Sequence, residues 1–292
     1  MDILVVHLFN ALLYASILFL IAGGLSLIYG VMRIVNLAHG NLFAIGAFLT
    51  ASAVGQWFAG SESAWLYLLL PIGAFGAAAL GAILEPTLLR RFYRRPEEYQ
   101  LLVTFGLLMI LEDLMRFIWG PYPISATVLF SKLGSAKVGE LVYPRYNLLV
   151  IAISALSAFL LWAFIYRTKF GVTLRATSQD MRRAAALGIN VNLVYVEAFT
   201  IGCFMAGLAG AIIVPSQSAV LGMGVDALVL SFIVVVTGGL GSLEGAAVGA
   251  LIVGAVRELG ITFFPEIELA VLYLIAASVL LVRPAGLFGK TT

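Results

Sequence analysis

The sequence predicts an all-α fold, a polytopic transmembrane helical bundle of about eight or nine spans. Of its 292 residues, 62% are hydrophobic and only 11% are charged, and the mean hydropathy is +1.07. A soluble domain carries roughly 25% charged residues, so the composition excludes that class. Uncharged runs of bilayer-spanning length recur along the chain, without the alternation of apolar and polar residues that marks a transmembrane β-barrel.

The apolar runs and the polar residues between them predict the order of the spans. The second and seventh spans are short or interrupted by glycine, so we expect broken or re-entrant helices among them. No segment outside the spans exceeds about 30 residues, which is too short for an independent core, so residues 1–292 should form a single membrane domain. The expected spans are 8–30, 41–58, 65–89, 100–119, 147–166, 194–213, 226–239, 245–262 and 268–282.

The distribution of basic residues predicts the orientation of the bundle. Lys and Arg gather in "RRFYRR" (residues 90–95), between Arg167 and Arg183, and at Arg283 and Lys290. If these segments and Arg33 face the cytoplasm, twelve of the 17 basic residues lie inside and five outside. This is the asymmetry of the positive-inside rule, and it predicts an outer N-terminus and an inner C-terminus.

Two polar, glycine-bearing segments interrupt the apolar pattern. A helix broken at membrane depth exposes N–H and C=O groups that hydrocarbon cannot satisfy, so a break there must be buried in protein or line water. One hypothesis places both segments beside a translocation pathway, where paired breaks often lie. The alternative for the first segment is an ordinary inner turn with Asn36 as the N-cap of the next helix. The candidate residues are Asn36, His39, Gly40 and Asn41 in the first segment and Gly238, Gly239, Gly241, Ser242 and Glu244 in the second.

A cytoplasmic segment between the fifth and sixth spans, residues 168–192, predicts a short amphipathic helix. Ser178 is a plausible N-cap, Asp180 falls in the first turn, where it complements the helix dipole, and Gly188 suits the stop. Between them lie Met181, Ala184, Ala185 and Leu187, with Arg182 and Arg183 among them. The segment is either a surface helix held at the lipid headgroups or a docking element for a soluble partner.

The remaining ionisable residues favour structural roles over catalysis. Glu112 and Asp113 are spaced to pair with Arg116 on one helix face, and Glu85 can reach the region of Arg90 and Arg91. Two histidines and one cysteine form neither a metal-ligand cluster nor a nucleophile with its base, so we expect no catalytic residue and no metal site. The chain lacks the G-x-x-x-x-G-K-[ST] phosphate loop, so ATP must bind elsewhere. We expect no nucleic-acid partner.

Four ordered stretches, spread over nearly the whole chain, carry a resemblance to a known family. They are "GLSLIYGVMRIVNLAHGNLFAIGAF" (24–48), the segment 168–192, "VTGGLGSLEGAAVGA" (236–250) and the tail "VRPAGLFGK" (282–290). Together they resemble permease subunits of bacterial ABC importers for branched-chain amino acids. The form "NLAHG" is similar to the LivH-type subunit rather than to its LivM-type partner.

The resemblance implies a multi-pass subunit in a bacterial inner membrane that forms half of a pathway for branched-chain or other hydrophobic amino acids. The expected partners are a LivM-type second permease, two cytoplasmic ATPases that hold ATP and Mg²⁺, a periplasmic substrate-binding protein and the lipid bilayer. This chain would hold no cofactor and would not be an enzyme. The resemblance makes Arg175–Gly188 the helix that docks on the ATPase, through Arg175, Ser178, Asp180, Arg182, Arg183, Ala184, Ala185, Leu187 and Gly188.

Two alternatives stay open at this point. Relatives of the family carry urea or other amides, so the chain is alternatively a urea or amide importer permease. A stand-alone secondary transporter is the second alternative, although no carboxylate at mid-depth stands out as its proton carrier.

Overall fold

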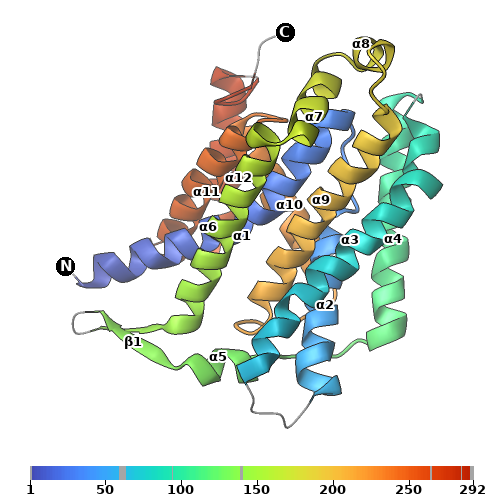
Figure 1. Ribbon diagram of the computed structural model, residues 1–292. Coiled ribbons are helices and arrows are strands. Elements are labelled where there is room, and N and C mark those ends of the chain that lie inside the picture. Colours follow the sequence, from blue (N-terminus) through green and yellow to red (C-terminus); the bar gives the residue numbers. More distant parts are fainter. Residues whose placement is uncertain are drawn as a thin grey trace.

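The computed structural model describes residues 2–58, 64–93, 95–138, 141–263, 265–283 and 285–289. Within these ranges the chain folds into a single bundle of helices, with a small hairpin at one end (Figure 1). Arg94 and Lys290, which contributed to the predicted orientation, lie outside the described residues.

The expected all-helical membrane bundle is confirmed, and each predicted span contains one long helix. Five segments are long and apolar enough to cross a membrane: Leu4–Met32, Ala64–Thr87, Arg145–Arg167, Val191–Ile213 and Leu243–Phe263. The long helices are α1 (Asp2–Met32), α2 (His39–Ser52), α3 (Leu70–Thr87), α4 (Glu97–Trp119), α6 (Arg145–Arg167), α9 (Val191–Ile213), α10 (Met223–Gly238), α11 (Leu243–Phe263) and α12 (Glu268–Val282).

Shorter elements connect these helices. The π-helical turn η1 (Ala53–Trp57) extends α2, and the 3-10 turns η2 (Ala64–Leu69), η3 (Leu89–Phe92) and η4 (Pro265–Ile267) flank α3 and α12. Between α4 and α6 lie α5 (Thr127–Leu133) and an antiparallel hairpin of β1 (Ser135–Val138) and β2 (Leu141–Pro144), with Ser135 opposite Pro144. Between α6 and α9 lie α7 (Lys169–Gln179) and α8 (Met181–Ala186).

The hairpin is the one departure from the all-helical expectation within the described residues. Tyr143 of β2 donates a hydrogen bond to Asn10 Oδ1 at 3.2 Å, and Ile124 forms an isolated antiparallel bridge with Ala219. These contacts tie the outer connection to both α1 and the loop before α10.

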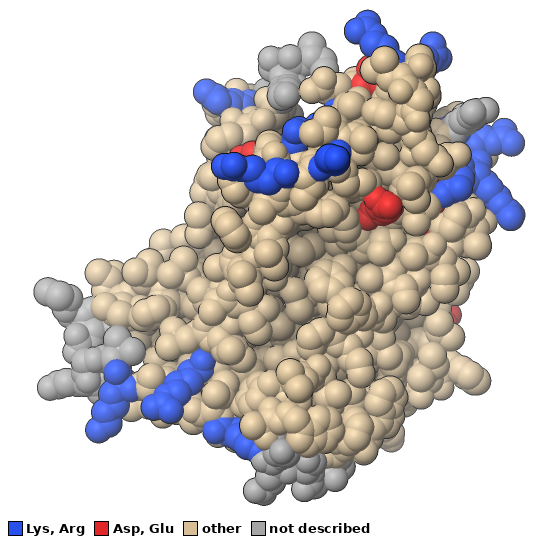
Figure 2. Space-filling view, viewed as in Figure 1, with Lys and Arg blue, Asp and Glu red and all other residues tan. Residues whose placement is uncertain are grey.

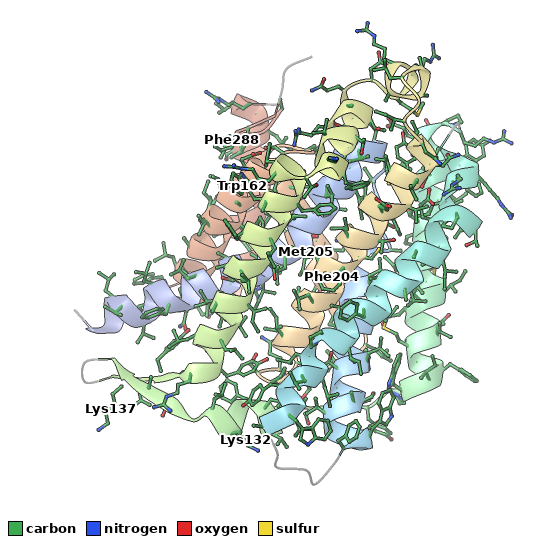
Figure 3. All side chains as sticks on the ribbon, viewed as in Figure 1. Lys132, Lys137, Trp162, Phe204, Met205 and Phe288 are labelled. Atoms are coloured by element: carbon green, nitrogen blue, oxygen red, sulfur yellow. The ribbon has the colours of Figure 1, made fainter. Side chains whose placement is uncertain are left out.

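The two ends of the bundle differ in charge as the positive-inside rule requires. Helices α7 and α8 and the C-terminal end lie at one end, and the hairpin and α5 lie at the other (Figure 1). Figure 2 shows most of the Lys and Arg of this face around the first end. Lys132 and Lys137 lie at the opposite end (Figure 3). We call these the inner and the outer end.

Helices α1 and α9 form the centre of the bundle, and small residues let them approach closely. A Cβ atom built on Gly24 would lie 2.5 Å from the carbonyl oxygen of Gly202, so any side chain there would separate α1 from α9. Close contact between small residues is a main source of helix association in lipid, where no hydrophobic effect acts between helices. Helix α4, in contrast, exposes Leu102, Ile110 and Phe117 to the surroundings of the bundle.

Candidate transport pathway and coupling segment

The first polar segment is a break inside the bundle. Helix α1 ends at Met32, and α2 begins at His39, whose Nε2 donates a hydrogen bond to the carbonyl of Ile21 at 3.1 Å. Ile21 lies eleven residues before Met32, about 16 Å along the axis at 1.5 Å per residue. Helix α2 therefore starts well below the inner end of α1. This position favours the broken-helix hypothesis over an ordinary surface turn.

The side chains of the first break are fully buried and only partly satisfied. Asn36 Oδ1 accepts the N–H of Ala38 at 3.1 Å, and Asn41 Nδ2 donates to the carbonyl of Leu108 at 2.6 Å. Asn36 is not the N-cap of α2, as the alternative required, because Ala38 occupies that position without a side-chain bond. Asn36 Nδ2, His39 Nδ1 and Asn41 Oδ1 have no partner among the described residues. Buried polar atoms of this kind are rare and mark a place where water or a ligand can enter.

The start of α2 packs directly against the start of α10. A Cβ atom on Gly40 would lie 1.9 Å from the carbonyl oxygen of Gly224. One oxygen of Glu112 accepts the N–H of Gly222 at 2.7 Å, so a carboxylate from α4 meets the positive end of the α10 dipole. The predicted pairing of Glu112 with Arg116 is wrong for this reason. Asp113 alone contacts Arg116, at 3.6 Å between exposed side chains.

Replacing Gly40 with alanine is expected to destabilise the bundle by about 1–3 kcal/mol, the usual range for an overpacked core. The added methyl group would collide with the backbone of Gly224, which cannot move without displacing α10. The midpoint of thermal denaturation of the purified protein measures the effect. Gly106→Ala is the matched control, because a Cβ atom on Gly106 of α4 meets nothing within 4 Å. Equal midpoints for the two variants would contradict this packing.

The second break joins α10 to α11 and is held by backbone geometry and by the C-terminal tail. Gly239 and Gly241 adopt φ angles of +111° and +79°, which side chains rarely tolerate. Ser242 caps α11 by accepting the N–H of Gly245 at 3.0 Å. The N–H of Phe288 donates to the carbonyl of Gly238 at 2.9 Å, so the tail satisfies the open end of α10.

A cavity of about 440 Å³ opens between the second break, the end of α1, the end of α6 and the second half of α7. Glu244 stands at its wall, and its Oε1 accepts the hydroxyl of Tyr166 at 2.5 Å. Figure 3 shows Phe288, another wall residue, at the inner end of the bundle. The cavity is lined by Ser26, Leu27, Tyr29, Gly30, Val31, Arg33, Ile165, Tyr166, Leu174, Arg175, Ser178, Gln179, Leu240, Gly241, Ser242, Leu243, Glu244 and Phe288.

The predicted coupling helix is two helices rather than one. Helix α7 ends at Gln179, and α8 begins after Asp180, whose Oδ1 accepts the N–H groups of Arg182 and Arg183 at 2.9 and 3.0 Å. The N-cap is thus Asp180 and not Ser178, whose hydroxyl donates to the carbonyl of Arg175 within α7. Hydrogen bonding to the N–H of Arg183, followed by that to Arg182, lowers the pKa of Asp180. The cap therefore stays ionised at neutral pH and is lost only as the pH falls through this lowered value.

The exposed side of the coupling segment is smaller than expected. Arg182, Arg183, Ala185 and Leu187 are exposed, but Ala184 is buried at 2% exposure. Gly188 ends the segment with a φ of +84°, as predicted. Ala184 therefore cannot contact a partner without unfolding α8, and we remove it from the docking surface.

The predicted site residues fall into three places. The cavity brings Arg175 and Ser178 of the coupling segment together with Gly241, Ser242 and Glu244 of the second break. Residues 36–41 lie apart from it, in the interior, and residues 180–188 form the exposed tip of the inner end. Sequence reasoning gave no site role to Arg33, Glu112, Tyr166 or Phe288. Of these, only the position of Arg33 next to the first break could have drawn notice.

A helical membrane bundle with two internal breaks, an inner cavity and an exposed inner helix pair is an arrangement that suits a membrane permease. The family model described as "Branched-chain amino acid transport system / permease component" matches residues 7–280. The chain belongs to this family. As expected, it is the permease subunit of an ABC importer, a multi-pass membrane protein and not an enzyme.

Individual relatives agree with the family, and those of the LivH type match over nearly all of both chains. The high-affinity branched-chain amino acid transport system permease protein LivH of Salmonella typhimurium is 27% identical over 97% of this chain and 95% of its own length. BraD of Pseudomonas aeruginosa, of the same description, is also 27% identical with the same coverage. The LivM protein of Escherichia coli K12 is 27% identical over 94% of this chain and 69% of its own. These matches confirm the LivH-type resemblance.

One solved structure also aligns with this chain. It is titled PsaBC from Streptococcus pneumoniae in complex with Fab, with 18% identity over 94% of this chain and 89% of that chain. The TM-score of this alignment is 0.48.

Proposed function

We propose that this chain forms half of the translocation pathway of an importer for branched-chain or other hydrophobic amino acids in a bacterial inner membrane. The observation that carries the proposal is the family match over residues 7–280, together with relatives of equal length that are described as branched-chain amino acid permeases. The second half would be a LivM-type permease, since LivM proteins also match over most of this chain.

We further propose that α7 and α8 transmit motion from two cytoplasmic ATPases, which would hold the ATP and Mg²⁺. The exposed Arg182, Arg183, Ala185 and Leu187 support docking, because they belong to or directly follow α8, which lies at the inner end of the bundle (Figure 1). Helix α7 is joined to α6 through Thr168, whose hydroxyl oxygen caps α7 at Gly171 N. A push on α8 would thus move the α7 wall of the cavity relative to the second break, a rigid-body change of the kind that opens gates.

The pathway itself would run beside the two breaks. The unpartnered Asn36 Nδ2, His39 Nδ1 and Asn41 Oδ1 support this course, because a polar solute entering there would satisfy them. A periplasmic binding protein would deliver the amino acid at the outer end.

Reconstitution into lipid vesicles tests the proposal. Vesicles that contain this chain, the second permease, the ATPases and the binding protein should take up leucine only when ATP is supplied. Vesicles with this chain alone should take up nothing under a sodium or proton gradient. Gradient-driven uptake by the isolated chain would identify a secondary transporter instead. ATP-driven uptake of urea without leucine would identify an amide importer, and either result would overturn the amino acid assignment.

A further inference from the structure

The inner cavity is lined by a basic and an acidic side chain whose hydrogen-bonding groups are not all occupied by the described residues. Its volume of about 440 Å³ is larger than a single amino acid needs and lies within the range of small-molecule sites. Leu27, Leu240, Leu243 and Phe288 supply apolar wall, and Ser26 and Ser242 supply polar wall. Such a mixture suits a ligand that is charged at one end and apolar at the other.

The free positive charge is Arg33. Its φ of +57° makes it the one described residue other than glycine in the left-handed region, at the position after a helix where glycine is preferred. Glycine would adopt this backbone conformation with less strain, so backbone geometry does not explain an arginine at this position. Its exposed side chain lines the cavity and makes no hydrogen bond or ion pair to the described residues.

The second arginine of the cavity, Arg175, already has partners within the protein. Arg175 donates to the carbonyl of Ile165, and its guanidinium lies over the ring of Tyr166, 5.2 Å from the centroid. Arg175 therefore shapes the wall and orients Tyr166, and it leaves Arg33 as the cation that can receive a ligand.

The negative charge is Glu244, in the first turn of α11. Tyr166 holds its Oε1, and its Oε2 makes no hydrogen bond to the part of the chain that the structure describes. A carboxylate accepts several hydrogen bonds, so Oε2 can take an ammonium group while Oε1 keeps the tyrosine. Arg33 and Glu244 line the same cavity but form no ion pair with one another within the described ranges. Neither charge is therefore neutralised by direct contact with the other.

We propose that this cavity is an inner binding site for a free α-amino acid with an apolar side chain. Arg33 would bind the α-carboxylate, Glu244 would bind the α-ammonium group, and the leucines with Phe288 would hold the side chain. Charge-assisted bonds to both charged groups distinguish an α-amino acid from an amine, a carboxylic acid or urea. The proposal rests on the proposed function and adds the recognition chemistry on the cytoplasmic side of the pathway.

Equilibrium binding of radiolabelled leucine tests the site. The sample is the purified complex of this chain with the second permease and the ATPases, without nucleotide and without binding protein. We expect saturable binding that isopentylamine and 4-methylpentanoate fail to displace, because each lacks one of the two charges. Arg33→Gly and Glu244→Gln should each weaken binding at least tenfold. Arg33→Gly relieves the left-handed strain, so a loss of binding cannot be ascribed to misfolding.

The matched controls are Arg95→Gly and Glu98→Gln, which remove exposed charges of the same types outside the cavity. Both should bind leucine as the unaltered complex does. Equal binding by the Arg33 and Glu244 variants, or displacement of leucine by either singly charged analogue, would overturn the site.

Uptake by the complete importer separates this proposal from the one on which it rests. If the complete importer takes up leucine but the complex without binding protein binds none, the inner site is refuted and the amino acid importer stands. If leucine is not taken up at all, the proposed function fails. Leucine sealed inside the vesicles should slow ATP-driven uptake by the unaltered importer, and 4-methylpentanoate sealed inside should not, as expected for a site that is filled from the cytoplasm and requires both charges. Equal slowing by the two solutes would contradict the site.

Discussion

Replacing Ala185 and Leu187 with glutamate is expected to abolish ATP-driven uptake while the protein still folds and inserts. Both side chains are exposed at the tip of the coupling segment, and Leu187 is 81% exposed. If this tip enters a groove of the ATPase, two carboxylates would be buried without partners, at a cost of several kcal/mol. A loss of about 3 kcal/mol weakens the complex roughly a hundredfold.

Co-purification of the ATPase with the permease pair measures this effect directly, and leucine uptake by the complete importer measures its consequence. Val142→Glu is the control, because Val142 is an exposed apolar residue of similar kind on β2, at the outer end. That variant should retain the ATPase in full. Retention of the ATPase by the Ala185 and Leu187 variant would show that the docking surface lies elsewhere.

Ala184 must be left unchanged in this experiment. Its 2% exposure and the bond from Ile189 N to its carbonyl place it on the packed side of α8. A variant with glutamate at this position would lose activity because the segment would unfold. Such a loss would say nothing about docking.

The helical bundle was predictable because hydropathy alone decides which segments can enter a bilayer. The two breaks were predictable for a related reason, because polar residues and glycine interrupt an otherwise apolar pattern there. Helix α2 nevertheless begins deeper than a surface turn allows, and only the bond from His39 to Ile21 reveals that depth. Local sequence fixes where a helix breaks, and tertiary packing fixes how far inside it resumes.

The details of the coupling segment show where local rules become ambiguous. Ser178 and Asp180 are both good N-caps and stand two residues apart, so sequence cannot choose between one longer helix and two short ones. The structure chooses Asp180 because its carboxylate can bond to two N–H groups at once. Similarly, α8 is too short for periodicity to show that Ala184 turns inward.

Hydrogen bonds between residues far apart in the chain could not be predicted from local sequence. Glu112 bonds to Gly222, which is 110 residues away, and thereby leaves Arg116 to Asp113. Tyr166 bonds to Glu244 across 78 residues, and Arg33 reaches the same cavity from the end of α1. Spacing rules describe neighbours on one helix, whereas these contacts depend on which helices become neighbours in space.

Replacing Arg90 with alanine is expected to destabilise the protein by about 3 kcal/mol, the lower end of the range for breaking a buried ion pair. Glu85 is fully buried at the inner end of α3, and Arg90 Nη2 contacts its Oε2 at 2.7 Å. The bond to Glu85 is the main reason that the pKa of Arg90 is raised. Without Arg90, the carboxylate keeps only the hydroxyl of Tyr93, at 2.7 Å. The midpoint of thermal denaturation should fall by about 6–12 °C.

Two comparisons decide whether the loss of stability comes from the carboxylate of Glu85 that is left without its arginine. Arg116→Ala also breaks an ion pair, but its partner Asp113 is 75% exposed, so the midpoint should change little. Combining Arg90→Met with Glu85→Gln removes both charges and keeps an acceptor for Tyr93, so it should recover most of the stability. If the double variant is as unstable as Arg90→Ala, the arginine does not act by neutralising Glu85. That result would assign the stability to the other bond of the guanidinium, from Nη2 to the carbonyl of Asn192 at 3.4 Å, because methionine keeps an apolar stem but cannot make this bond.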